Sequence, residues 1–130
     1  MGDRHGEIHW NELQTADIDK ALAFYRGVLG WRIEEMQMGE AEPYRLAWAG
    51  ETQVGGLWAM TGPDFAGMPD AWITYFAVDD VDAAAKAVPE TGGRVLRAPF
   101  DVPGIGRILV AEDAGGAVIG LMTPASRAAV

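Results

Sequence analysis

The sequence predicts an α+β fold in which two βαβββ units form a half-open, eight-stranded, barrel-like cleft with the helices outside. The first observation is an internal repeat, since Asp17 and Gly30 recur as Asp80 and Gly93 at an offset of about 63 residues. The second is that each copy joins one stretch of helical periodicity to several stretches typical of strands. The third is the segment 60–71, which contains two prolines and two glycines and separates the copies.

The composition is that of a globular protein and excludes several kinds of function. The chain has 130 residues, enough for one domain with a core. Its net charge of -9 argues against a nucleic-acid partner, because phosphate binding needs clustered Lys and Arg. The absence of cysteine excludes disulfides and thiolate chemistry. We expect a cytoplasmic protein without a membrane partner, because neither a spanning apolar run nor a secretory signal is evident.

The first unit is expected at 7–59 and contains the clearer of the two helices. This helix should run from about Ile18 to Leu29, because Asp17 is suited to cap its start and Gly30 to end it. The residues predicted to form its buried stripe are Ile18, Ala21, Leu22, Tyr25 and Val28. The four strands are expected at 7–14, 31–38, 43–49 and 53–59. One face of the third of these strands carries Tyr44, Leu46 and Trp48.

The second unit is expected at 72–124 and repeats this order with a weaker helix. The helix should open at Asp80, and Pro89 should shorten or distort its end. The strands are expected at 72–78, 94–100, 107–111 and 117–122, with a loop at 101–106. Residues 7–124 together are expected to form a single domain.

Three strings of residues carry a resemblance to a known family. They are WNELQTADIDKALAFYRGVLGW, WITYFAVDDVDAAAKA and GRILVAEDAGGAVIGLMTP. In this order they resemble the vicinal oxygen chelate superfamily, which includes glyoxalase I, extradiol dioxygenases, fosfomycin-resistance enzymes and bleomycin-resistance proteins. The resemblance covers about residues 7–124 and implies a glyoxalase/bleomycin-resistance-like fold and a homodimer. It specifies the fold better than the reaction, because one fold supports many chemistries.

The metal ligands of the superfamily are absent from the corresponding positions of this chain. In metal-dependent members, one His, Glu or Gln on each of the first, fourth, fifth and eighth strands binds the ion. The positions transferred to this sequence are Trp10, Gly56, Ile73 and Gly120. None of these side chains is a ligand for a divalent ion, so we expect no metal and no cofactor. A shift of one residue would bring in His9 or Thr74, but we expect Thr74, Phe76 and Val78 to face the helix.

Strand alternation predicts an aromatic and apolar cleft with one carboxylate and one phenol. The residues expected to line it are Trp10, Glu12, Trp48, Gly56, Trp58, Ile73, Tyr75, Gly120 and Met122. The two glycines should leave volume at its floor. The alternative is that the aromatic side chains only pack the core between the two units.

Glu12 is the most specific candidate among these residues. A carboxylate in an apolar cleft can act as a general base or bind the cation of a ligand. The alternative is a structural carboxylate that is hydrogen-bonded to Gln14, Arg45 or Tyr75. The sequence leaves both interpretations open.

Two other groups of polar residues favour structural roles. Asp79, Asp80 and Asp82 stand at a helix start, where capping explains them better than a cation site. His5 and His9 lie near the amino terminus, and a metal site would need further convergent ligands.

The sequence therefore favours a binding protein whose metal-free cleft holds a small aromatic or cationic organic molecule, as bleomycin-resistance proteins do. One alternative is a metal-independent isomerase or lyase in which Glu12 or Tyr75 transfers a proton. A second is a metal-dependent lyase or dioxygenase, if the transferred ligand positions are wrong. A third is an interaction domain whose cleft is closed by its own tryptophans. The sequence does not specify which ligand binds or whether the units pair within one chain or between two chains. It also does not specify whether the segments 60–71 and 101–106 cover the cleft.

Overall fold

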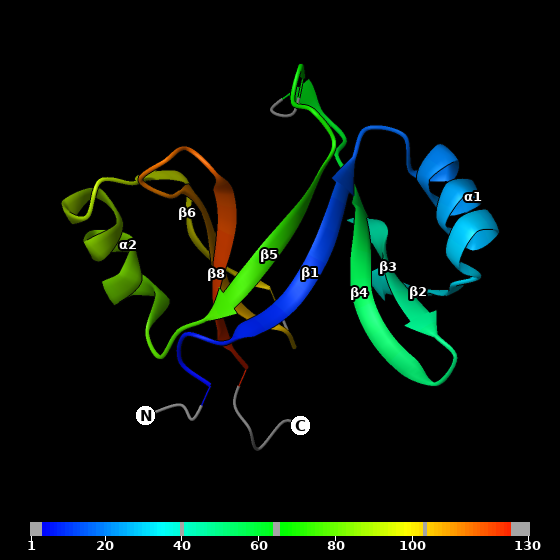
Figure 1. Ribbon diagram of the computed structural model, residues 1–130, viewed down its shortest axis with the longest axis horizontal. Coiled ribbons are helices and arrows are strands. Elements are labelled where there is room, and N and C mark those ends of the chain that lie inside the picture. The colour runs from blue at the N-terminus through cyan, green and yellow to red at the C-terminus, as the bar shows by residue number, and fades with distance from the viewer. Residues whose placement is uncertain (1–3, 40, 64–65, 103, 126–130) are drawn as a thin grey trace. The chain divides into compact units, whose positions relative to one another are not determined.

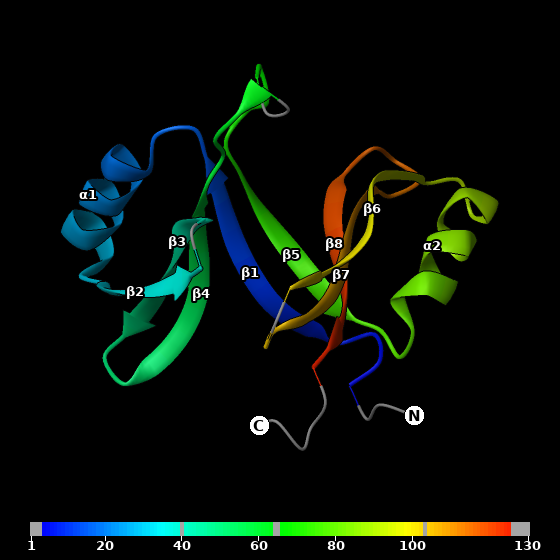
Figure 2. The same cartoon turned by 180° about the vertical axis from the view of Figure 1, so that it is seen from behind.

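The computed structural model describes residues 4–39, 41–63, 66–102 and 104–125 (Figure 1). The chain divides into two compact units. The first unit is Trp10–Ile73, and the second combines the chain from Thr74 onward with the residues up to His9. Each unit contains one helix that packs on its own strands, which Figure 2 shows from behind.

The first unit is a mixed sheet of four strands with one helix. The strands are β1 (Ile8–Thr15), β2 (Arg32–Met38), β3 (Ala41–Ala49) and β4 (Thr52–Ala59). Their order is β2-β3-β4-β1, with β1 parallel to β4 and the other pairs antiparallel. The helix α1 (Ile18–Leu29) connects β1 to β2 and has the predicted bounds.

Both ends of α1 are explained by single residues. The Asp17 carboxylate accepts a hydrogen bond from the backbone N–H of Lys20, as an N-cap does. Gly30 has φ 68 and donates its N–H to the Arg26 carbonyl, a left-handed geometry that favours glycine. Both capping predictions are confirmed.

The core of the first unit lies between α1 and one face of the sheet. It consists of Leu13, Leu22, Ala47 and Leu57, against which Ile18, Ala21, Tyr25, Trp31 and Ile33 pack. The prediction that Val28 belongs to the buried stripe is wrong, because its side chain is 62% exposed. Tyr25 and Trp31 stack at a centroid distance of 5.2 Å.

The second unit repeats the architecture with a shorter helix. The strands are β5 (Ala71–Ala77), β6 (Arg94–Val102), β7 (Gly106–Glu112) and β8 (Val118–Pro124), and the helix is α2 (Val81–Glu90). Their order is β5-β8-β7-β6, with β5 parallel to β8. Strands β6 and β7 extend into the segment 101–106 that the sequence assigned to a loop. The predicted fold class is confirmed by these two βαβββ units.

Two backbone hydrogen bonds attach the start of the chain to the second unit. The Gly6 N–H donates to the Ala77 carbonyl, and the Ala77 N–H donates to the Glu7 carbonyl. The sequence assigned residues 7–9 to the first unit and residues 72–73 to the second, whereas the structure groups 7–9 with the second unit and 72–73, at the start of β5, with the first. The sequence of one segment does not reveal to which unit the segment belongs, because this depends on the strand with which its residues pair.

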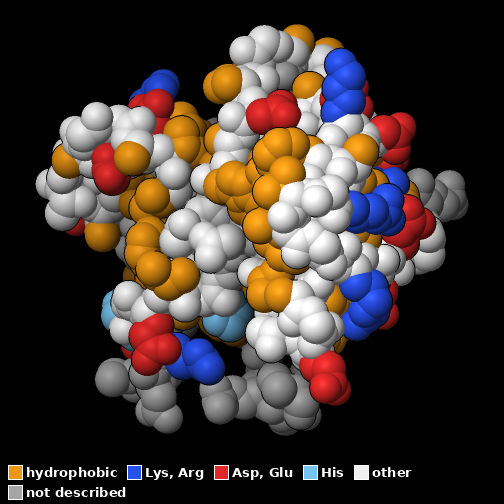
Figure 3. All heavy atoms as spheres, turned by 45° about the vertical axis from the view of Figure 1, so that its right-hand side comes forward, with side chains coloured by type: hydrophobic (Ala, Val, Ile, Leu, Met, Phe, Trp, Pro, Cys, Tyr) orange, Lys and Arg blue, Asp and Glu red, His pale blue; other side chains and the backbone are white. Residues whose placement is uncertain are grey.

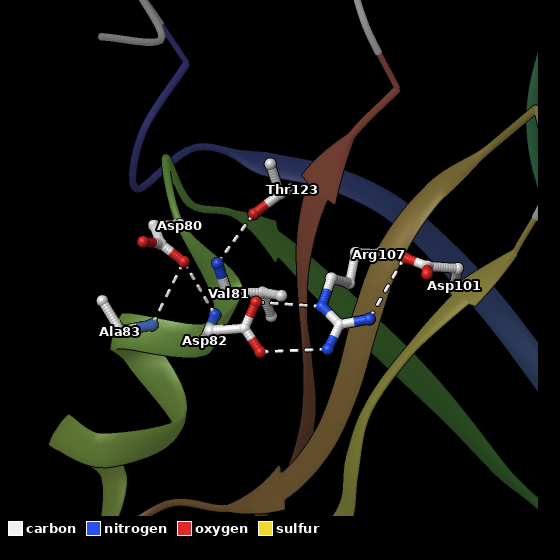
Figure 4. A network of polar contacts seen from close by, with 7 residues as sticks. All are labelled: Asp80, Val81, Asp82, Ala83, Asp101, Arg107 and Thr123. Carbon is white, nitrogen blue, oxygen red and sulfur yellow. Dashed lines mark hydrogen bonds and ion pairs between the residues drawn. The ribbon is translucent and has the colours of Figure 1, made fainter.

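The start of α2 is fixed by capping and by a guanidinium. The Asp80 carboxylate accepts from the N–H groups of Asp82 and Ala83, and the Thr123 hydroxyl accepts from Val81 N–H (Figure 4). Arg107 donates two hydrogen bonds to Asp82, of 2.9 and 3.1 Å, and one of 3.2 Å to Asp101. These contacts connect the helix start to β7 and β8.

The end of α2 agrees with the prediction for Pro89. The helix stops at Glu90, one residue after this proline. Gly93 follows where the chain passes close to β7, since a Cβ at this position would lie 2.5 Å from the Glu112 carbonyl oxygen. The core beneath α2 consists of Val81, Leu109 and Ala111, with Val78, Ala85, Val88 and Leu121 around them. No helix among the described residues is long and apolar enough to cross a membrane.

Candidate functional site

Each sheet has a face that points away from its helix, called here the helix-distal face. In the first unit, Leu13 is aligned with Leu57 in the parallel β1–β4 pair, and both pack toward α1. Glu12 is aligned with Gly56, so these two belong to the opposite, helix-distal face. Leu46 of β3 lies beside Gly56 on the same face. The sequence-predicted alternation of β1 and β4 is thus confirmed.

A hydrogen-bonded network of four side chains lies on this face. The Trp10 indole Nε1–H donates to the Tyr44 hydroxyl oxygen at 2.9 Å. The Tyr44 hydroxyl donates to Glu12 Oε1 at 2.8 Å, and the Gln14 amide donates to Glu12 Oε2 at 2.9 Å. All four side chains are half-buried. Tyr44 and Gln14 therefore both donate to the Glu12 carboxylate, and Trp10 is joined to it through Tyr44. We call these four residues the Glu12 network.

The partners of Glu12 correct the sequence analysis in part. Gln14 is confirmed as a partner, and Tyr44 was not considered. The prediction that Arg45 binds Glu12 is wrong, because Arg45 aligns with Leu57 on the helix side and forms an ion pair with Glu42 at 2.9 Å. Tyr75 as a partner of Glu12 stays a prediction.

Tyr44 occupies the space that Gly56 leaves open. A Cβ added to Gly56 would lie 1.8 Å from the Tyr44 hydroxyl oxygen. Any larger side chain at this position would displace Tyr44 from the Glu12 network. The expectation that Gly56 leaves a vacant floor is therefore wrong, because the phenol fills that volume. Tyr44 shares the strand alternation of Trp48, and this signal could have included it among the candidates.

Trp48 and Trp58 complete the aromatic part of the first unit's face. The Trp48 indole N–H donates to Glu34 at 3.0 Å, and the Arg32 guanidinium lies 5.0 Å from its ring centroid. Trp58 follows Gly56 on β4 with the same alternation and is half-buried. Ile73 is buried, with 2% of its side chain exposed.

The second unit has a matching arrangement around Gly120. Tyr75 aligns with Gly120, and a Cβ at Gly120 would lie 2.2 Å from Cδ2 of the Tyr75 ring. Phe76 aligns with Leu121 on the side of α2, which confirms that Tyr75 is on the helix-distal face. Met122 is buried on the same face. Here too, a tyrosine fills the volume above a glycine.

The transferred metal-ligand positions do not fit a metal ion. Trp10, Gly56, Ile73 and Gly120 provide no anionic or imidazole donor. A donor side chain at 56 or 120 would collide with the tyrosine above it. The described residues contain no group of three or more His, Asp or Glu side chains that could hold a metal.

The other polar residues singled out from the sequence have structural contacts. His5 Nδ1 accepts the Asp79 backbone N–H at 2.9 Å. Burial lowers the pKa of His9, and the nearby Arg4 lowers it further. Asp80 is the N-cap of α2, as predicted, and Asp82 binds Arg107.

The comparisons with known proteins agree with this fold. A sequence model of the Glyoxalase/Bleomycin resistance protein/Dioxygenase superfamily matches residues 7–121. The chain belongs to this superfamily. Among solved structures, methylmalonyl-CoA epimerase from Mycobacterium tuberculosis has a TM-score of 0.66 and 19% sequence identity, over 99% of this chain and 95% of that one. At this identity, the likeness extends to the fold alone.

Two relatives found by sequence comparison have higher identity. The "Putative glyoxylase CFP32" of Mycobacterium tuberculosis (strain CDC 1551 / Oshkosh) is 41% identical over 120 residues, which is 92% of this chain and 45% of that protein. The "Anthracycline biosynthesis protein DnrV" of Streptomyces peucetius is 33% identical over 123 residues, covering 86% and 45%. The chain spans about half the length of these relatives.

Proposed function

We propose that this superfamily member binds a small organic molecule, aromatic or cationic, on the helix-distal face of the first unit without a metal ion. The observation that carries the proposal is the Glu12 network. In this network the Tyr44 hydroxyl and the Gln14 amide both donate to the Glu12 carboxylate, which orients it. Trp10, Trp48 and Trp58 add aromatic surface, which suits planar or cationic groups.

Tyr75, Gly120 and Met122 enter the proposal as the corresponding positions of the second unit. Ile73 is proposed as an apolar contact of the first. The superfamily supports the general kind of site, because named members include proteins with small-molecule ligands, such as a methylmalonyl-CoA epimerase in complex with methylmalonyl-CoA. The following experiment tests whether a cationic aromatic molecule binds at Glu12.

A test of binding uses benzylamine, which is cationic at neutral pH, and benzyl alcohol as its neutral counterpart. We expect benzylamine to bind more tightly to the wild type, and Glu12→Gln to weaken it about tenfold or more, since hydrogen bonds to charged groups contribute about 1.5–3 kcal/mol. Glu51→Gln, in the turn between β3 and β4, removes the same charge elsewhere. Calorimetry that finds equal losses for both variants would reject the proposal.

The 2.8 Å contact between Tyr44 and Glu12 favours a second candidate, a metal-independent isomerase or lyase. Glu12 would take a proton from carbon, and the Tyr44 hydroxyl would turn to stabilise the developing oxyanion. The test is solvent-deuterium exchange at the α-carbon of methylmalonyl-CoA, followed by NMR. Exchange that is lost in both Glu12→Gln and Tyr44→Phe would support the enzyme. Exchange that persists in both variants would reject these roles.

Metal analysis of the purified protein distinguishes both candidates from a metal-dependent lyase or dioxygenase. We expect no stoichiometric metal and no change in tryptophan fluorescence on titration with Zn²⁺, Ni²⁺, Mn²⁺ or Fe²⁺. A stoichiometric ion would contradict the transferred positions.

A homodimer and a cytoplasmic location are also proposed. Sedimentation velocity tests the dimer, and a single species with the mass of one chain would reject it.

A further inference from the structure

Arg97 is an arginine without a carboxylate partner among the described residues of an acidic protein. Its guanidinium lies 4.0 Å from the centroid of the Phe100 ring. The other described arginines of the second unit all form ion pairs: Arg4 with Glu7, Arg94 with Glu112, and Arg107 with Asp82 and Asp101. Arg97 therefore differs from its neighbours in what surrounds it, although the chain has 19 acidic residues.

The strand register places Arg97 on the helix-distal face of the second unit. Arg97 aligns with Val110 and Val110 with Gly120, whereas Val95 aligns with Ala111 in the core beneath α2. Phe100 aligns with Ile108 on the same face as Arg97. Val110 and Phe100 are thus apolar neighbours of Arg97 on this face. Arg97 is exposed and Phe100 is half-buried, so both can be reached by a ligand.

The stacking on Phe100 leaves the hydrogen-bonding capacity of Arg97 for another molecule. A ring face interacts with the plane of the guanidinium, but the five N–H donors lie along its edges. These donors have the forked geometry that matches a carboxylate or phosphate. The adjacent ring provides an apolar surface for the body of the same ligand.

We infer that Arg97 and Phe100 form a binding contact for a small organic anion, in which the carboxylate or phosphate binds Arg97 and an apolar group packs on Phe100 and Val110. This contact lies on a different unit from the Glu12 network and does not depend on it. The two faces differ in charge, since the row of the first unit that contains Gly56 ends in Glu12 and Glu34. The corresponding row of the second unit, which contains Gly120, ends in Arg97.

The test uses benzoate and phenyl phosphate as the two kinds of anion, with benzamide as the neutral probe. Calorimetry gives affinity, and the Arg97 Nε–H resonance in NMR reports the contact. We expect Arg97→Gln to weaken anion binding about tenfold or more, because hydrogen bonds to charged groups are strong. Arg94→Gln, on the same strand, should change it less than about twofold, because Arg94 already binds Glu112. Phe100→Leu should weaken benzoate binding by a factor between those of Arg94→Gln and Arg97→Gln.

Several outcomes would overturn this inference. They are no saturable binding of either anion to the wild type, equal losses in Arg97→Gln and Arg94→Gln, and equal binding of benzamide and benzoate. If benzoate binds and phenyl phosphate does not, the contact is specific for carboxylates. If phenyl phosphate binds and benzoate does not, it is specific for phosphates. Glu12→Gln should leave benzoate binding unchanged, so that failure of this inference and failure of the proposed function can be told apart.

Discussion

Gly56 shows how one missing side chain defines the chemistry of the proposed site. The absence of a Cβ lets the Tyr44 hydroxyl lie against β4, where it joins Trp10 to Glu12. The sequence identified Gly56 and Glu12 as candidates through strand alternation. It missed that Tyr44 fills the volume, because contact across strands depends on register, which alternation within one strand does not specify.

Gly56→Ala should disrupt the Glu12 network. The new methyl group would lie 1.8 Å from the Tyr44 oxygen, so Tyr44 must move and both of its hydrogen bonds must break. We expect a loss of about 1–3 kcal/mol in the free energy of unfolding, typical of overpacking, measured by urea denaturation. Gly27→Ala is the control, because a Cβ there meets nothing within 4 Å and alanine favours helix. Equal stability of Gly56→Ala and wild type would contradict the geometry.

At the scale of elements, helix boundaries were predictable and strand pairing was less so. Asp17, Gly30 and Asp80 act locally, so the sequence identifies their roles. Val28 is the exception, since periodicity places it in the stripe but its side chain is exposed. The ion pairs of Arg107 join segments distant in sequence and were not predicted.

The two N-caps should differ in strength. Asp80 accepts hydrogen bonds from two backbone N–H groups, whereas Asp17 accepts one. Asp80→Ala should therefore destabilise the protein more than Asp17→Ala, within the range of about 0.5–2 kcal/mol observed for lost caps. Thermal and urea unfolding of both variants measure the difference. A larger effect of Asp17→Ala would show that capping geometry does not set the order.

Acid should weaken the contact between α2 and β7. Hydrogen bonding to Arg107 lowers the pKa of Asp82, and the guanidinium charge lowers it further. A lowered folded-state pKa contributes stability above the ordinary aspartate pKa, and this is lost as the pH falls through the folded value. Arg107→Gln should reduce the dependence of the free energy of unfolding on pH below about pH 4, since aspartate titrates near 3.9 when unperturbed. Urea unfolding between acidic and neutral pH measures this, and an unchanged slope would reject it.

At the scale of the molecule, the sequence predicted the fold through its repeat and the resemblance of its strings to a superfamily. The exchange of residues 7–9 into the second unit could not be predicted, because it arises from the backbone pairing of Glu7 with Ala77. Each helix-distal face has a tyrosine above a glycine, but the two tyrosines come from strands that do not correspond, Tyr44 from β3 and Tyr75 from β5. The two faces carry different charged residues, so one fold presents two different surfaces.

The most direct test of the proposed function follows the Trp10 indole N–H in a ¹H–¹⁵N NMR titration with benzylamine. Trp10→Phe assigns this resonance among the five tryptophans. The proposed site predicts a saturable shift of the Trp10 signal, because its N–H donates to the Tyr44 hydroxyl that binds Glu12. Glu12→Gln should greatly reduce this shift. A Trp10 signal that stays in place, or shifts equally in Glu12→Gln, would contradict a ligand site at the Glu12 network.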